Sequence, residues 1–155
     1  MIKKINISEK AVFKDLDVSD KEEALKVMSE AFLENGFVNE GYYQSILDRE
    51  KKAPTGIEAY DYGIAIPHTD PKFVNEDSLG VAVLKDPIIF NSMVNVQETL
   101  EVKVIFLLGL SESTKHLNIL RQIMELIKEE GVLKEMTTMP QKQLYDYLQN
   151  HLKSE

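Results

Sequence analysis

The stretch Tyr62-Gly63-Ile64-Ala65-Ile66-Pro67-His68-Thr69-Asp70 decides how the rest of the chain can be arranged. Ile64 to Ile66 are apolar on both faces, which is typical of a strand buried in the centre of a sheet. Pro67 cannot donate to a neighbouring strand, and it restricts Ile66 to an extended conformation. We therefore predict that the strand ends at Pro67 and that His68 emerges at its carboxyl end. Open α/β sheets usually bind their ligands at that edge.

His68 by itself has two interpretations. A histidine near a strand end is often a structural residue held by a hydrogen bond. A neutral imidazole is also a good nucleophile near pH 7, because its unperturbed pKa is about 6.5. The sequence on either side of His68 favours the second interpretation.

Two blocks of sequence around His68 carry a resemblance to a known family. The first is Arg49-Glu50 followed by Pro54-Thr55-Gly56-Ile57, and the second is Ala65-Ile66-Pro67-His68. In this order and spacing they resemble the EIIA domain of the fructose/mannitol family (EIIA type 2) of the bacterial sugar phosphotransferase system, in particular its galactitol-type branch. The resemblance extends from about Ser19 to the last predicted helix.

Length and composition are those of an ordinary globular protein. A chain of 155 residues, 43% hydrophobic and 28% charged, is long enough for one domain with a hydrophobic core. No apolar run approaches the roughly 20 residues of a membrane helix, and the first residues lack the pattern of a signal peptide, so we expect a cytoplasmic protein. The net charge of −8 argues against nucleic acid as a partner.

Helical spacing of apolar residues predicts four helices and a short helical turn. Ser19 and Glu22 form a capping box for the first helix, which Gly36 ends. Asn39 can cap a second helix that ends near Arg49-Glu50. A long helix begins between Ser111 and Thr114 and has Leu117, Leu120, Ile123, Met124 and Ile127 inward. Val132 to Met136 forms a short turn, and Pro140 opens the last helix.

Strands are predicted between these helices. Val102 to Leu108 is rich in β-branched residues and reads as a central strand. Leu79 to Leu84 reads as another, and Asp86-Pro87 interrupts it before Ile88-Ile89-Phe90. Shorter extended segments are expected within Ile2 to Phe13 and Ile57 to Tyr60. The mixture predicts a single three-layer α/β/α domain over residues 1–155, with helices on both faces of the sheet. The resemblance implies the same architecture with a mixed sheet.

A phosphoryl carrier needs in-line positioning and positive partial charge around the phosphoryl oxygens. Arg49 can hold those oxygens in bidentate geometry, although it can also be a solvated arginine at a helix end. The amino end of the helix starting near Thr114 to His116 offers backbone N–H groups to anions. That end follows the strand Val102 to Leu108, so we expect it at the same sheet edge as His68.

Four further kinds of group near His68 have roles that the sequence leaves open. The resemblance implies a second site histidine at His116, as in the mannitol and fructose branches, but galactitol-type members need not keep it. Thr55 and Thr69 can offer hydroxyls to a phosphate or can be ordinary turn residues. The imidazole can be oriented by a backbone carbonyl or by a nearby carboxylate; the carboxylates are those of Glu50, Glu58, Asp61 and Asp70.

The resemblance also implies partners. Phosphate would pass from the histidine carrier protein HPr to His68, and then to a cysteine of an EIIB domain, with the membrane EIIC one step further on. The sequence contains no cysteine, so we expect a free-standing EIIA component and a separate EIIB. We expect no cofactor and no metal site. The oligomeric state and the sugar stay open.

Two other functions are compatible with the same residues. One is a regulatory EIIA-like protein, of the nitrogen or metabolic regulation type, whose phosphorylation state is sensed by protein partners without sugar transport. The other is a histidine-based hydrolase or metal-binding protein, which would need a second base or further ligands at fixed spacing.

Overall fold

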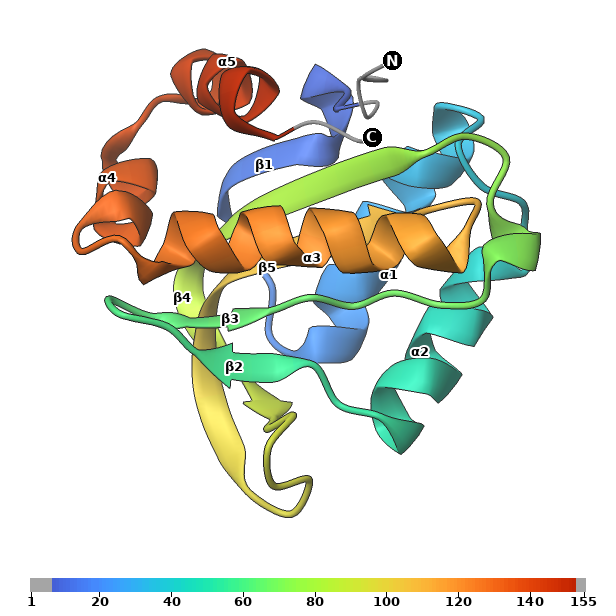
Figure 1. Ribbon diagram of the computed structural model, residues 1–155, viewed down its shortest axis with the longest axis horizontal. Helices are drawn as coiled ribbons and strands as arrows, with labels where there is room; N and C mark the ends of the chain where they lie inside the picture. The colour runs from blue at the N-terminus through green and yellow to red at the C-terminus, as the bar shows by residue number, and fades with distance from the viewer. Residues whose placement is uncertain (1–6, 153–155) are drawn as a thin grey trace.

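A five-stranded mixed sheet is the centre of the structure, a computed structural model that describes residues 7–152 apart from the side chains of residues 113–116 (Figure 1). The strand order is β1-β4-β5-β3-β2. β1 is parallel to β4 and β3 to β5, whereas β4 with β5 and β2 with β3 are antiparallel. The strands are β1 (Val12–Leu16), β2 (Gly56–Glu58), β3 (Gly63–Ala65), β4 (Ser78–Asn91) and β5 (Thr99–Gly109).

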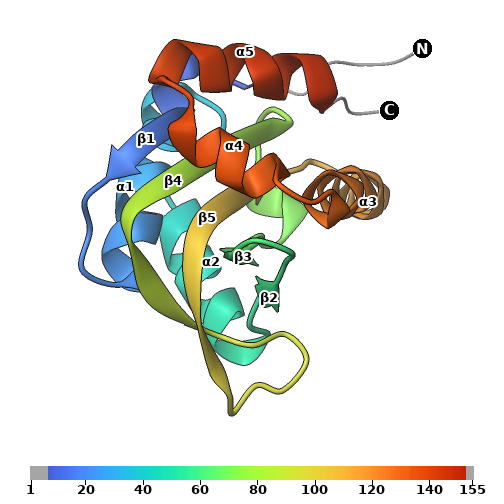
Figure 2. The same ribbon diagram turned by 90° about the vertical axis from the view of Figure 1, so that its left-hand side faces the viewer.

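Helices cover both faces of this sheet (Figures 1 and 2). On one face lie α1 (Lys21–Glu34) and α2 (Tyr42–Lys52). On the other lie α3 (Ser113–Lys128), α4 (Val132–Thr138) and α5 (Gln141–His151). Short 3₁₀ turns, Glu9–Ala11 and Pro71–Phe73, precede β1 and follow β3. The three-layer α/β/α architecture predicted from the sequence is confirmed.

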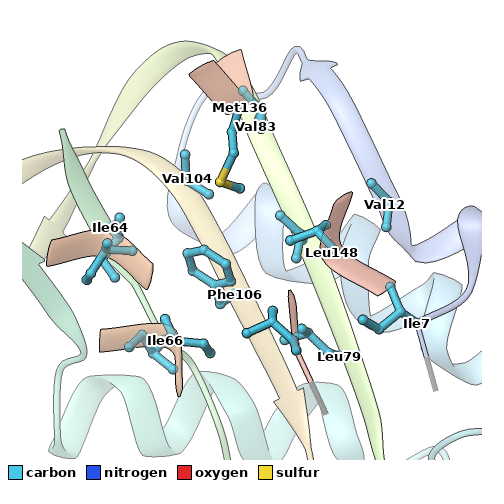
Figure 3. Packing of buried hydrophobic residues seen from close by; sticks show 14 of the residues in the cluster. Ile7, Val12, Ile64, Ile66, Leu79, Val83, Val104, Phe106, Met136 and Leu148 are labelled. Atoms are coloured by element: carbon cyan, nitrogen blue, oxygen red, sulfur yellow. The ribbon is translucent and has the colours of Figure 1, made fainter. Parts of the chain in front are cut away.

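Alternate side chains along β3 and β5 point into two core layers, one on each face of the sheet. Ile64, Ile66 and Phe106 face α3, α4 and α5, and Figure 3 shows Phe106 between the residues of β3 and those of β4. Ala65 and Ile105 face α1 and α2. Successive side chains of a strand point to opposite faces, so a strand covered on both sides needs an unbroken apolar run. This is why the run ending at Pro67 is buried, one strand in from the sheet edge.

Expected boundaries differ at α1, α2 and β4. Helix α2 has Gly41, not Asn39, at its N-cap position. Helix α1 is capped by Asp20, which accepts from the Glu23 N–H at 2.9 Å, in place of the expected box of Ser19 and Glu22. Pro87 does not divide two strands, because β4 runs through it and its register against β5 shifts between Val83 and Ile88. A proline lacks the N–H for a ladder bond, and a bulge removes the need for one.

The inward face of α3 is also narrower than expected. Ile119, Ile123 and Ile127 are buried, whereas Leu117 is 68% exposed and Met124 is 38% exposed. Leu117 precedes Ile119 by two residues, which rotates it by about 200° around a helix with 3.6 residues per turn. Leu117 therefore lies on the outer side of α3.

Candidate active site

His68 lies just beyond the carboxyl end of β3. The carbonyl of Pro67 accepts from the N–H of Leu108 at 3.0 Å, so the chain stays attached to β5 up to that residue. Because β3 and β5 are parallel, their carboxyl ends meet at one edge of the sheet. Helix α3 begins three residues after Leu110 at the same edge. The predicted neighbourhood of His68 and the start of this helix is confirmed.

An open pocket surrounds His68. Its lining comes from α2, from the segment after β3 and from the first turns of α3: Arg49, His68, Thr69, Asp70, Pro71, Leu117 and Leu120. His68 is half-buried and Arg49 is exposed. Arg49 therefore shares a solvent-accessible pocket with the imidazole, as predicted.

Two hydrogen bonds fix α2 against this edge. The buried Tyr42 hydroxyl donates to the carbonyl of Leu108 at 2.6 Å. One turn further on, the hydroxyls of Ser45 and Thr69 are hydrogen-bonded to each other. Arg49 follows Ser45 by four residues and so lies on the same side of the helix. The attachment of Ser45 to Thr69, the neighbour of His68, thus brings Arg49 to the pocket.

The imidazole of His68 is oriented by the backbone. Its Nδ1 lies 2.9 Å from the carbonyl oxygen of Ile66. A carbonyl only accepts, so Nδ1 carries the proton and, in the neutral ring, Nε2 carries the lone pair. Burial lowers the pKa of His68 below its ordinary value, the charge of Arg49 also lowers it, and the bond to Ile66 raises it. A lowered pKa favours the neutral ring, the state in which Nε2 carries a lone pair.

Of the two orienting groups left open by the sequence, the backbone carbonyl is the one bonded to Nδ1. Asp61 accepts from the N–H of Gly131 at 3.0 Å, ahead of α4. Asp70 accepts from the N–H of Lys72 at 3.0 Å. Glu58 is exposed on β2, and Glu50 is buried and bonded to Thr55. Periodicity could not choose among these groups, because the choice depends on side-chain rotamers.

The two threonines have different places. Thr69 lines the pocket beside His68. Thr55 is only 2% exposed, and its hydroxyl donates to Glu50 and accepts from the N–H of Ile66. The expectation that Thr55 offers its hydroxyl to a phosphate is therefore corrected, because that hydroxyl is buried and occupied beneath the site.

His116 belongs to the first turn of α3, but its side chain lies outside the described residues. The next residue, Leu117, lines the pocket, so the helix start does reach the site. Helix α3 has Glu112 at its N-cap position and no side-chain hydrogen bond there. Ser45, Leu117 and Leu120 were not foreseen as site residues. The spacing of Ser45 from Arg49 is the one signal that could have indicated the first of them.

This fold and this site define a class of protein. The chain matches the family described as "Phosphoenolpyruvate-dependent sugar phosphotransferase system, EIIA 2" over residues 6–151. The protein therefore belongs to this EIIA family, and the resemblance seen in the sequence is confirmed.

The chain is similar to EIIA components for mannitol and for galactitol. The mannitol-specific phosphotransferase enzyme IIA component of Bacillus subtilis is 31% identical over 114 residues, covering 73% of this chain and 74% of that protein. The galactitol-specific EIIA component of Escherichia coli K12 is 23% identical over 138 residues, covering 86% and 88%. Two solved structures align with a TM-score of 0.77 at 18% identity: the crystal structure of IIA mannitol from Escherichia coli, and the complex of enzyme IIA mannitol with phosphorylated IIB from the same organism. Each alignment covers 94% of this chain and 99% of the other.

Some relatives are much longer than this chain. The transcriptional regulator ManR of Bacillus subtilis is 31% identical over 77 residues, which are 50% of this chain but 11% of the regulator. The multiphosphoryl transfer protein 1 of Escherichia coli K12 is matched over 13% of its length. In the part of the chain that the structure describes, no helix combines the length and apolar character needed to cross a membrane.

Proposed function

We propose that the protein is a phosphoryl carrier between two protein partners and that Nε2 of His68 carries the phosphoryl group. The observation that carries this proposal is the hydrogen bond from Nδ1 to the Ile66 carbonyl, 2.9 Å long, in a pocket shared with Arg49. It makes Nε2 the nucleophilic nitrogen and turns that side of the ring away from the backbone. The proposed donor is the phosphohistidine of HPr, and the proposed acceptor is a cysteine of EIIB.

The transfer needs no cofactor. The Nε2 lone pair attacks the phosphorus of the donor phosphohistidine, the new N–P bond forms, and the donor N–P bond breaks as its electron pair returns to the donor imidazole. The His68 ring gains positive charge in this step. Its Nδ1–H then donates to Ile66 as a charge-assisted hydrogen bond, which stabilises the product. In the second step the cysteine thiolate attacks phosphorus and the electron pair returns to Nε2.

Arg49 is proposed to stabilise the phosphoryl oxygens during both steps. Its guanidinium borders the same pocket as the imidazole and is exposed, so it can meet a group delivered from outside. The amino end of α3 supplies a second source of positive partial charge at the same edge. Thr69 is also buried and its hydroxyl bonds that of Ser45, but unlike Thr55 it lines the pocket, so it remains a proposed phosphate ligand. His116 remains a proposed second site histidine.

The openness of the pocket suits protein partners. Leu117, 68% exposed, and the partly buried Leu120 form an apolar margin beside His68. Such a margin can exclude water when another protein covers it. The complex of mannitol IIA with phosphorylated IIB supports an EIIB acceptor for this chain by similarity. Because the family match spans residues 6–151, it also supports a single EIIA domain.

The relatives support sugar uptake of the mannitol or galactitol class as the pathway. Galactitol stays one of two proposals, since components for both sugars are among the relatives. We further propose that the protein acts in the cytoplasm, where its donor is found, with the EIIC permease reached only through EIIB.

Phosphorylation of the purified protein tests the site. Incubation with phosphoenolpyruvate and the general donor proteins should give one acid-labile, base-stable phosphate that is absent from His68→Gln. His151→Gln is the matched control, because His151 is an exposed histidine at the end of α5 whose Nδ1 bonds the carbonyl of Tyr147. Labelling that persists in His68→Gln would refute the proposed site.

A regulatory role is the second candidate, favoured by the similarity to ManR over 77 residues. The chemistry at His68 would be the same in both roles, but the fate of the phosphate would differ. Transfer from the labelled protein to a cysteine of EIIB supports the transport role. Labelling without transfer to any EIIB tested supports the regulatory one.

A further inference from the structure

Glu50 is a buried carboxylate in the last turn of α2, only 4% exposed. It accepts two hydrogen bonds from the same residue. The Thr55 N–H donates to Oε2 and the Thr55 hydroxyl donates to Oε1, each at 2.8 Å. A carboxylate that accepts two bonds in the interior holds its partner in one orientation.

The Thr55 hydroxyl passes this constraint to β3. Its one hydrogen is donated to Glu50, so its lone pairs are available to the N–H of Ile66, which donates to Oγ1 at 3.1 Å. The backbone ladder between β2 and β3 ends at the pair of Gly56 and Ala65. The side chain of Thr55 thus supplies the next rung, beyond the last backbone pair.

This hydrogen bond fixes Ile66, the residue whose carbonyl bonds the imidazole of His68. The N–H of Ile66 is fixed by Thr55, and the carbonyl of Pro67 is fixed by Leu108 at 3.0 Å. Between these two attachments lies the Ile66 carbonyl, which accepts from Nδ1 of His68 at 2.9 Å. Pro67 has no N–H that could provide another attachment. The direction of the Ile66 carbonyl therefore depends on the Thr55 bond on one side.

We propose that Glu50 is a positioning residue for phosphoryl transfer: through Thr55 and Ile66 it holds His68 in the tautomer with the proton on Nδ1 and the nucleophilic lone pair on Nε2. This inference rests on the proposed role of His68. Polar chains in a low-dielectric interior polarise one another, which strengthens the final bond to the ring. Burial raises the pKa of Glu50, while the two bonds from Thr55 and the charge of Lys21 lower it. The largest of these effects is burial, so the net pKa of Glu50 lies above its ordinary value.

Glu50, the first residue of this series of hydrogen bonds, is next to Arg49 on α2. One residue lines the pocket and the other fixes the backbone beneath the imidazole. The sequence block Arg49-Glu50 with Pro54-Thr55 thus contains a group for the phosphoryl oxygens and the two side chains of the positioning chain.

The test compares Glu50→Gln, Thr55→Val and Thr55→Ser with the wild type. The tautomer and pKa of His68 are measured by nitrogen-15 NMR, and transfer from phospho-HPr is measured with the same samples after circular dichroism has verified folding. Glu50→Gln removes one acceptor oxygen, and Thr55→Val removes the hydroxyl. Both should increase the fraction of the ring protonated on Nε2 and slow transfer by about tenfold, the scale of one hydrogen bond. Thr55→Ser keeps the hydroxyl and should behave as the wild type.

Glu58→Gln is the matched control, since Glu58 is exposed on β2 and the positioning chain does not include it. A wild-type tautomer and transfer rate in folded Glu50→Gln and Thr55→Val would overturn the inference. If those two variants do not fold, an altered tautomer in Thr55→Ser would overturn it. Failure of the proposed function would look different, because phosphate would then still be bound by His68→Gln or be absent from the wild type.

Discussion

Arg49 and Glu50 are adjacent on α2, yet Arg49 is exposed and Glu50 is buried. Arg49 lines the open pocket with His68, whereas Glu50 is buried and reaches the backbone beneath it through Thr55. Because both residues are on one helix, the bonds that attach α2 to the sheet edge set both positions together. The two roles that we propose, charge for the phosphoryl oxygens and orientation of the nucleophile, would therefore not be independent in this fold.

Arg49→Ala should slow phosphoryl transfer by about 1–3 kcal/mol of barrier, the scale of a hydrogen bond to a charged group. Removing this charge should also raise the pKa of His68, which Arg49 lowers. Folding should be nearly unaffected, because an exposed arginine contributes little stability. Transfer rates and thermal unfolding measure the two effects. Arg121→Ala, which removes an exposed arginine from α3, is the control, and an equal loss of rate in both variants would contradict a specific role for Arg49.

His116→Ala should be milder than His68→Ala. The amino end of α3 keeps its backbone N–H groups after His116→Ala, whereas His68→Ala removes the proposed nucleophile itself. Transfer rates of both variants with the same phospho-HPr decide the comparison. Complete loss in His116→Ala as well as in His68→Ala would mean that His116 is essential to the step.

The strands and most helices could be predicted because their signals are local. The apolar run Val104 to Leu108 in β5 and the combination of Gly63, Pro67 and His68 depend on neighbouring residues, and the structure agrees with both. The placement of Arg49 near His68 came from the resemblance, since nothing in the spacing of α2 indicates which side meets the sheet edge. The structure supplies the reason, the bond between Ser45 and Thr69.

Sequence reasoning missed the side-chain hydrogen bond between Glu50 and Thr55 and the rotation of α3. The sequence leaves Thr55 either a phosphate ligand or an ordinary turn residue, and the structure shows that its hydroxyl donates to the buried carboxylate of Glu50. Leu117 was assigned to the core because a helical stripe of leucines usually faces inward. Ile119 and Ile123 face the core, and this rotation of the helix leaves Leu117 exposed. The first miss depends on the side-chain rotamers of two residues five apart in the sequence. The second depends on a rotation of the helix that periodicity leaves undetermined.

The outward position of Leu117 has a measurable consequence for stability. Leu117→Ala should change the free energy of unfolding by less than about 0.5 kcal/mol, as surface substitutions usually do. Ile123→Ala on the same helix should cost about 2–5 kcal/mol, because it leaves a cavity where Ile123 is 0% exposed. Chemical denaturation of both variants gives the comparison. Similar losses would place Leu117 in the core after all.

The environment of His68 predicts how stability depends on pH. Burial makes the folded state disfavour the charged ring, so the pKa of His68 is lower in the folded protein than the roughly 6.5 of an unfolded chain. Between these two values the unfolded state binds more protons. The free energy of unfolding must then rise with pH across this window and fall when acid protonates the ring.

The contribution of the other titrating groups cancels when the free energy of unfolding of His68→Gln is subtracted from that of the wild type. This difference in unfolding free energy should increase with pH and become constant above the pKa of the unfolded chain, about 6.5. Denaturation at a series of pH values, with NMR titration of His68, tests it. A difference that decreases as pH rises would require a folded-state pKa above about 6.5, and one that still decreases above pH 7 would require a ring that is charged at neutral pH. Nε2 would then carry a proton at neutral pH and could not attack phosphorus.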